Sequence, residues 1–138
     1  MSIEVKDLCF AYGEHEVLHG VSFKAEAGEF LSILGPNGVG KTTLSRCLCG
    51  LIREQAGQIA LNGRPLNRKE RQKAAFCVMQ DVNHQLFSDS VWGECRMSAP
   101  DAPDSTVEEV LDSLHLLPFR ERHPMSLSGG QKQRLAVA

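Results

Sequence analysis

The sequence predicts an α/β fold organised around one glycine-rich loop, and three observations support this. A nearly continuous apolar run, Phe30–Leu34, enters the loop Gly35–Thr42. A helical pattern, Thr42–Leu51, leaves the loop. A second continuous apolar run, Ala74–Met79, also has the length of a strand. Because such runs are typical of strands covered on both faces, we expect a parallel sheet with helices packed against it.

Length and composition fit a single soluble domain. The chain has 138 residues, of which 42% are apolar, and a net charge of −2. This charge gives no electrostatic footprint for nucleic acid or for an anionic membrane. No apolar run approaches the ~20 residues that cross a bilayer, and the N-terminus lacks the apolar core of a signal peptide. We therefore expect a cytoplasmic protein that does not bind nucleic acid.

The five cysteines give no sign of a disulfide framework or a zinc site. Their number is odd and no C-x-x-C pair occurs. Most have apolar neighbours, so we expect small buried side chains in a reducing compartment.

The N-terminal region predicts an antiparallel pair of strands. Ile3–Phe10 is rich in β-branched and apolar residues, and Val17–Lys24 follows after a short turn. The helix after the glycine loop is predicted by an apolar stripe with spacing i, i+3, i+4, i+7, formed by Leu44, Cys47, Leu48 and Leu51. Gly50 lies near the expected end of this helix.

The middle of the chain predicts a hairpin and a basic helix. Gln58–Leu61 is a short strand, and Asn62-Gly63 is a hairpin-type turn. Arg64–Lys73 carries five basic residues, which predicts a solvated helix face before the next strand. The alternative is a contact surface for an acidic partner.

The last third predicts short helices separated by polar segments. Asp81–Ser90 is polar and loop-like, and Val91–Met97 is a short helix capped by Ser90. Ser105–Glu108 is predicted to be a capping box. It starts a helix with an apolar stripe that ends near Leu117-Pro118.

The glycine loop has the residues that phosphate binding requires. It matches G-x-x-x-x-G-K-[ST] at every fixed position through Gly35, Pro36, Asn37, Gly38, Val39, Gly40, Lys41 and Thr42. Glycines let successive backbone N–H groups face inward and form an anion nest, and the helix N-terminus adds its own N–H groups. We expect Lys41 to reach the terminal phosphates and the Thr42 hydroxyl to hold Mg²⁺. The alternative is an ordinary glycine-rich turn with a surface lysine.

A second phosphate-type element lies near the C-terminus, at Leu127–Gln131 (Leu-Ser-Gly-Gly-Gln). Ser128 is a good helix N-cap, and Gly129 and Gly130 leave the first-turn N–H groups open. Lys132 and Arg134 add positive charge nearby. The alternative is a plain helix cap, which would leave the paired glycines unexplained.

With both elements the chain resembles the nucleotide-binding domain of ATP-binding cassette (ABC) transporters. Gly35–Thr42, extended by Thr43, matches the Walker A loop of that family, and Leu127–Gln131 matches its signature motif. Gln80 matches the glutamine of the Q-loop, and Tyr12 stands where the family has an aromatic residue that stacks on adenine. Without the other motifs, the alternatives are that Tyr12 is a buried core tyrosine and that Gln80 is an ordinary surface residue.

The resemblance implies a P-loop NTPase core with two appended parts. The division is an N-terminal antiparallel β subdomain at about 1–28, a P-loop core at 29–80, and a Q-loop and helical subdomain at 81–138. It also implies that the cofactors are ATP and Mg²⁺. Lys41 and Gln80 would be catalytic, and Thr42 and Gln80 would contact the metal. The nucleotide would contact Tyr12, Gly35 to Thr43, and Ser128, Gly129, Gly130 and Gln131.

The partners implied by the resemblance are a transmembrane transporter subunit and a second ATPase subunit. Ser128–Gly130 would bind the γ-phosphate held by the second subunit, and Gln80 would link the site to the membrane partner. The location implied is peripheral, on the inner face of the cell membrane. Gln85-Leu86-Phe87 makes the chain most similar to the energy-coupling factor type, which takes up vitamins and metal ions. The alternative for this segment is an ordinary polar surface loop.

The family pattern also requires residues that this sequence does not show. Phosphoryl transfer needs a carboxylate on Mg²⁺ and a group that positions water. In the family both come from an apolar strand that ends in Asp-Glu after the signature motif, followed later by a histidine. We therefore expect the C-terminal part of the core to be missing. Two alternatives to a transport ATPase stay open, namely an ATP-binding fragment or regulatory module without hydrolysis, and a soluble ABC protein outside transport.

Overall fold

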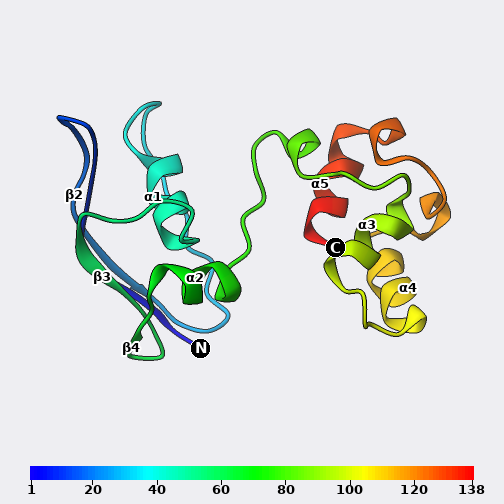
Figure 1. Ribbon diagram of the computed structural model, residues 1–138, viewed down its shortest axis with the longest axis horizontal. Helices are drawn as coiled ribbons and strands as arrows, with labels where there is room; N and C mark the ends of the chain where they lie inside the picture. The colour runs from blue at the N-terminus through cyan, green and yellow to red at the C-terminus, as the bar shows by residue number, and fades with distance from the viewer. The chain divides into compact units, whose positions relative to one another are not determined.

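The computed structural model describes residues 1–138, and the chain divides into two compact units. Unit 1 is Met1–Cys77 and unit 2 is Val78–Ala138. Figure 1 shows the strands β1–β4 and the helices α1 and α2 in unit 1, and the helices α3–α5 in unit 2. Each unit has its own hydrophobic core, so the two are described separately.

Unit 1 is built on a four-stranded antiparallel sheet with the order β2-β1-β3-β4. Its strands are β1 (Ile3–Tyr12), β2 (His15–Ala25), β3 (Ala56–Leu61) and β4 (Arg64–Pro65). The predicted N-terminal strands and the predicted hairpin are confirmed, and the turn residues Asn62 and Gly63 have positive φ angles of 51° and 76°. These angles suit the tight two-residue turns that join antiparallel strands.

The core of unit 1 lies where helix α1 (Lys41–Leu48) packs on this sheet. The helix contributes Leu44 and Cys47, which are buried against sheet residues that include Leu8, Phe10 and Ile59. Burying each large side chain contributes about 1.5–3 kcal/mol relative to leaving it in water. Leu44, Cys47 and Leu48 of the predicted apolar stripe therefore hold the helix on the sheet, whereas Leu51 lies beyond the end of the helix and is exposed.

The C-terminal end of α1 is closed by two sets of hydrogen bonds. Gly50 has a φ of 68°, and the N–H groups of Gly50 and Leu51 donate to the carbonyls of Cys47 and Arg46, as in a Schellman motif. Arg68 Nε and Gln72 Nε2 then donate to the Gly50 carbonyl over 2.8 and 2.9 Å. These two side chains come from helix α2 (Arg68–Ala74), so α2 fixes the end of α1.

The basic segment is more closely tied to the protein than predicted. Arg64 pairs with Glu70, Arg68 caps α1, and Arg71 pairs with Glu54. The prediction of a solvated face is wrong for Arg71, whose side chain is only 1% exposed. Its charge is compensated by the Glu54 carboxylate, which lies 17 residues away in the sequence and gave no local signal.

The two predicted buried strands are not present. Phe30–Leu34 and Ala75–Met79 are irregular, and Phe30 and Phe76 are almost fully exposed. A continuous apolar run becomes a buried strand only where other segments supply hydrogen bonds and cover both faces. Within residues 1–138 no segment does so, and the parallel sheet expected from these runs does not form.

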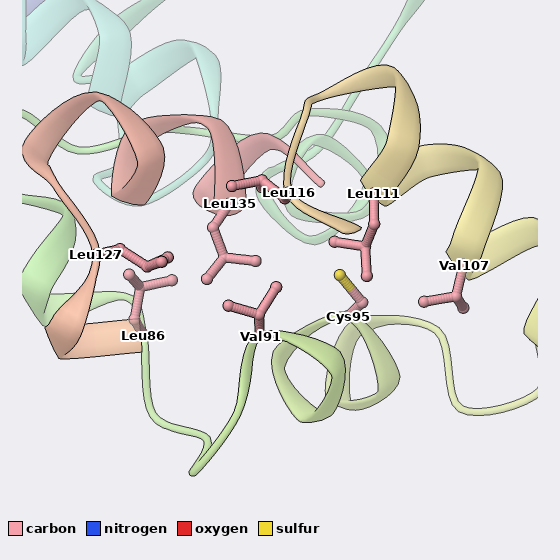
Figure 2. Packing of buried hydrophobic residues seen from close by; sticks show 8 residues of the cluster. All are labelled: Leu86, Val91, Cys95, Val107, Leu111, Leu116, Leu127 and Leu135. Atoms are coloured by element: carbon pink, nitrogen blue, oxygen red, sulfur yellow. The ribbon is translucent and has the colours of Figure 1, made fainter. Parts of the chain in front are cut away.

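Unit 2 is helical. Its α-helices are α3 (Val91–Ser98), α4 (Asp104–Ser113) and α5 (Gly129–Val137), and its 3₁₀ helices are η1 (Val82–His84), η2 (Leu117–Phe119) and η3 (Pro124–Ser126). Figure 2 shows the core side chains pointing toward one another from these helices and the segments between them, namely Leu86, Val91, Cys95, Val107, Leu111, Leu116, Leu127 and Leu135. The segment 81–90 is therefore less loop-like than predicted, because Val82 and Leu86 are buried.

The single tryptophan of the chain, Trp92, lies on the side of this core. The guanidinium carbon of Arg120 lies 4.3 Å from the centre of the indole ring, and that of Arg96 lies 5.3 Å from it. Such contacts contribute about 0.5–1 kcal/mol at exposed sites. Together with the pair between Arg120 and Glu108, they fix the position of the Trp92 ring in unit 2.

The helix ends of unit 2 test the predicted caps. The Ser90 hydroxyl accepts a hydrogen bond from the Gly93 N–H over 2.9 Å, so the predicted cap of α3 is confirmed. The predicted capping box at 105–108 is wrong, because α4 begins at Asp104 after Pro103 and has no side-chain cap. Pro103 has a φ of −57°, which already suits a helix start. The helix ends at Ser113, earlier than predicted, through a Schellman motif with His115 at φ 55°.

Candidate nucleotide-binding site

The glycine loop turns sharply between the irregular segment 30–34 and helix α1. Gly35, Gly38 and Gly40 have φ angles of 155°, 85° and 103°. A side chain would be strained at Gly38 and Gly40, because L-residues rarely adopt such angles. The Val39 N–H donates weakly to the Pro36 carbonyl over 3.5 Å, which closes the turn. The loop thus has the backbone shape for which its glycines are needed.

Gly40 also fixes the loop against strand β2. A Cβ atom at this position would lie 2.9 Å from Val17 Cγ1 and 3.2 Å from Leu18 Cδ2. Distances below 3.0 Å require neighbouring atoms to move, so only glycine allows this approach. The close packing places the start of α1 beside the β1–β2 hairpin.

The Lys41 side chain folds back over the loop. Its Nζ atom donates to the carbonyl oxygens of Gly35 and Pro36 over 2.7 and 2.8 Å. The ammonium group is therefore held at the mouth of the loop, where two carbonyls balance its charge. A phosphate oxygen is a stronger, charged acceptor, and could replace these contacts with a short movement of the side chain.

The N-terminus of α1 is open to an anion. Its N-cap residue, Gly40, provides no side-chain hydrogen bond, and the first turn has no acidic residue. The first N–H groups of a helix have no partner within the helix, and they carry a partial positive charge. The chemistry of this end thus fits a phosphate group.

The two threonines after Lys41 lie in different environments. Thr42 is exposed, whereas Thr43 is buried with an exposed fraction of 7%. The residues 1–138 contain no group of three or more His, Cys, Asp or Glu side chains that could hold a metal ion. The exposed Thr42 hydroxyl could be one ligand of a Mg²⁺ ion, with phosphate oxygens and water as the others, which is the usual mode of binding for this ion.

Tyr12 lies at the end of β1 in the same unit as the glycine loop. It pairs with His15 across the hairpin and is 48% exposed. Its ring contacts Phe10 edge to face, with 4.8 Å between ring centres. The alternative of a buried core tyrosine is therefore wrong. Figure 1 shows the tip of the β1–β2 hairpin and the glycine loop at the same end of unit 1.

The start of α5 is a capping box. The Ser128 hydroxyl accepts from the Gln131 N–H over 3.3 Å, and Gln131 Oε1 accepts from the Ser128 N–H over 2.9 Å. Gly129 and Gly130 are exposed, and no atom lies within 4 Å of an added Cβ at either position. Ser128 and Gln131 thus stabilise the helix, while the two glycines leave its first turn accessible.

Gln80 is exposed in the irregular first residues of unit 2. The next residue, Asp81, caps η1 by accepting the Asn83 N–H over 3.0 Å. This backbone hydrogen bond lowers the pKa of the Asp81 carboxyl. Asn83 Oδ1 in turn accepts from Lys132 Nζ over 3.0 Å, which joins the segment after Gln80 to helix α5. The sequence predicts that Lys132 adds positive charge to the phosphate-type element. In the structure its ammonium group donates to the Asn83 side chain instead.

Three contacts that shape the site had no signal in the sequence. These are the approach of Gly40 to Val17, the hydrogen bonds of Arg68 to the end of α1, and the Lys132–Asn83 contact. The last joins residues 49 positions apart. Local patterns show which residue types suit phosphate, but they do not show these distant supports.

Comparison with known proteins identifies the family. The family model described as ABC transporter matches residues 18–138. The chain therefore belongs to this family, as its motifs predict.

Several proteins with similar sequences are described as ATP-binding proteins of transporters. A putative ABC transporter ATP-binding protein of Treponema denticola is 55% identical over 134 residues, which cover 97% of this chain and 27% of that protein. The energy-coupling factor transporter ATP-binding protein EcfA of Methanocaldococcus jannaschii is 34% identical and is covered to 53%. The sn-glycerol-3-phosphate import protein UgpC of Ruegeria pomeroyi is 38% identical and is covered to 40%. The chain spans about half or less of the length of these relatives.

Comparison with solved structures points to the same family. The solved structure of CbiO1 from Clostridium perfringens, described as part of the ABC transporter complex CbiONQ, is 27% identical and superposes with a TM-score of 0.84. The match covers 98% of this chain and 59% of that protein. The predicted class, an α/β P-loop NTPase with an antiparallel β part and a helical part, is thereby confirmed. No helix of the chain combines the length and apolar character that crossing a membrane requires.

Proposed function

We propose that this chain is the ATP-binding part of an ATPase subunit that drives a membrane uptake transporter. The observation that carries the proposal is the arrangement at the start of α1. There an uncapped helix N-terminus, three glycines with positive φ angles and the Lys41 ammonium lie in one loop. These are the groups that bind the phosphates of a nucleotide. Membership of the ABC transporter family supports ATP as that nucleotide.

Each residue near the loop has a proposed part. The backbone of Gly35–Thr43 would hold the phosphates, with Lys41 on the terminal ones and the Thr42 hydroxyl on Mg²⁺. The metal would supply charge neutralisation of the phosphate oxygens during transfer. Tyr12 would stack on adenine, and its exposed ring at the loop end of the sheet supports this.

The second element is proposed to act on another subunit. Ser128, Gly129 and Gly130, with Gln131 as their cap partner, would bind the γ-phosphate held by a facing ATPase subunit. The open first turn of α5 supports this role. Gln80 would contact Mg²⁺ and attacking water and respond to the transmembrane partner. The proposed parts are a β subdomain at 1–28, a core at 29–80 and a helical part at 81–138, and the boundary between the two compact units lies between Cys77 and Val78.

The transport role is a finer proposal. Similarity to EcfA supports the energy-coupling factor type, for which the resemblance of the motifs implies uptake of vitamins or metal ions and a place on the cytoplasmic face of the membrane beside the transporter. Similarity to UgpC at comparable identity supports import of other solutes equally well. The proposal of vitamins or metal ions as cargo therefore depends on the Gln85-Leu86-Phe87 segment, in which Leu86 is a core residue.

The proposal is tested by nucleotide affinity. We expect Lys41→Ala to weaken Mg-ATP binding at least about tenfold, equivalent to ~1.4 kcal/mol, because a charge-assisted contact is lost. Lys69→Ala removes the same charge from exposed helix α2 and should leave affinity unchanged. Equal affinity of wild type and Lys41→Ala would contradict the proposal. ATP turnover measured alongside decides between an ATPase and a module that binds without hydrolysis.

A further inference from the structure

Two half-buried cysteines meet beside helix α1. Cys49 is the C-cap residue of α1, and Cys77 lies in the irregular segment after α2. Cys49 Sγ lies 4.0 Å from the Phe76 carbonyl oxygen, on the residue before Cys77. The neighbouring Cys77 thiol also contributes to the raised pKa of Cys49, after burial as the larger cause. Residues 28 positions apart in the sequence thus bring their sulfur atoms together.

The other three cysteines lie elsewhere. Cys47 is fully buried in the core of unit 1, and this burial raises the pKa of its thiol to about 11. Cys95 is buried in the core of unit 2, and Cys9 donates its thiol to the Asp7 carbonyl on the sheet. Thiols react as thiolates, so the buried ones are poorly reactive. Cys49 and Cys77 are both close together and partly accessible.

We infer that Cys49 and Cys77 form a reversible disulfide when the protein meets a peroxide. One thiolate takes an oxygen atom from the peroxide and becomes a sulfenic acid, and the remaining peroxide oxygen leaves as water after protonation. The second thiol then attacks this sulfur, the S–S bond forms, and the sulfenic oxygen leaves as a second water. Two thiols are oxidised and one hydrogen peroxide is reduced to two waters. A small thiol such as dithiothreitol reverses the step by exchange.

The bond would join the end of the helix that follows the glycine loop to the segment after α2, and both parts lie in unit 1. Helix α1 begins with Lys41 and has Cys49 as its C-cap residue, while Cys77 comes three residues after the end of α2. Closing the bond would fix the irregular segment 75–77 to the end of α1. Burial, together with the neighbouring Cys77 thiol, raises the pKa of Cys49, so the reaction should be faster in alkaline buffer. The disulfide stands apart from the proposed nucleotide binding and is measured without nucleotide.

The experiment is peptide mapping of the 138-residue chain after treatment with hydrogen peroxide. Trypsin releases the peptides 47–53 and 74–96, each of which contains two cysteines. We expect these two peptides to be linked, with the loss of two hydrogen atoms, and to separate again with dithiothreitol. Fragment ions should place the bond between Cys49 and Cys77. Cys49→Ser and Cys77→Ser should both abolish the link.

Matched variants and a denatured sample complete the test. Cys47→Ala and Cys95→Ala each remove the other cysteine of one linked peptide and should leave the link in place, as should Cys9→Ser. Guanidinium should lower the yield severalfold, because the two thiols then lose their folded proximity. A native chain in which other cysteines oxidise while this pair stays unlinked would overturn the inference. An equal yield in guanidinium, or a bond assigned to Cys47 or Cys95, would overturn it as well.

Discussion

The guanidinium of Arg71 is bound inside unit 1 by the carboxylate of Glu54, with Nη1 and Oε1 2.8 Å apart and a second contact from Nη2. The Arg71 side chain is 1% exposed and that of Glu54 is 21% exposed. Arg71 Nε has no hydrogen-bond partner, so the pair does not satisfy every buried polar atom. Desolvation of the two charges therefore offsets much of their attraction.

Removing one partner should be costly. We expect Glu54→Ala to lower the free energy of unfolding by about 3–5 kcal/mol, because a buried charge is left uncompensated. Urea unfolding followed by circular dichroism measures the change. Glu14→Ala, at an exposed position in the same unit, should stay within about 0.5 kcal/mol of wild type. If the double variant Glu54→Leu/Arg71→Met is no more stable than Glu54→Ala, then packing rather than charge sets the cost.

The same pair predicts how stability depends on pH. Burial alone would raise the pKa of Glu54, but the hydrogen bond and charge of Arg71 outweigh it and lower the pKa below its ordinary value of 4.5. The stabilisation is present above the unfolded value and is lost as pH falls through the folded pKa. The stability gap between wild type and Glu54→Gln should therefore shrink as pH falls below about 4.5. A gap that stays constant down to acid unfolding would argue against this linkage.

Two glycines with similar backbone angles should respond differently to alanine. Gly13 and Gly50 have φ angles of 60° and 68°. An added Cβ meets nothing within 4 Å at Gly13, but lies 2.5 Å from the Arg68 carbonyl oxygen at Gly50. Gly13→Ala should cost about 1–2 kcal/mol of backbone strain, and Gly50→Ala about 1–3 kcal/mol more from the clash. Thermal and urea unfolding of both variants check this. Equal losses would show that α2 moves away from α1 without cost.

Alanine substitutions at two serines should distinguish the observed helix cap at Ser128 from the predicted one at Ser105. Ser128→Ala should lower stability by about 1 kcal/mol, because its hydroxyl caps α5. Ser105→Ala should change stability by less than about 0.5 kcal/mol, since α4 has no side-chain cap. Urea unfolding compares the two under identical conditions. A larger loss at Ser105 would restore the capping box that the sequence predicts there.

Elements with local signals were predictable from the sequence. Residues close together in the sequence determine strands β1 and β2, helix α1, and the caps at Ser90 and Ser128. The position of α4 was predicted less well, because Pro103 starts the helix before the serine that resembled a cap.

Features that depend on distant segments were not predictable. The apolar runs Phe30–Leu34 and Ala74–Met79 have the composition of buried strands, but strand formation depends on neighbours that a local pattern does not specify. The Glu54–Arg71 pair is hidden for the same reason. At the site, the loop itself is plain from its glycines and lysine. The packing of the loop against Val17, however, depends on a three-dimensional contact.

The chain contains one tyrosine and one tryptophan, and each compact unit holds one of them. Tyr12 lies at the edge of unit 1 and Trp92 at the core of unit 2. Excitation of the indole alone therefore reports optically on the helical unit, while the phenol band reports on the sheet unit. A titration with adenine nucleotide can therefore follow the two units separately through their own fluorescence, without an attached dye. Adenine stacked on Tyr12 would change the phenol signal directly.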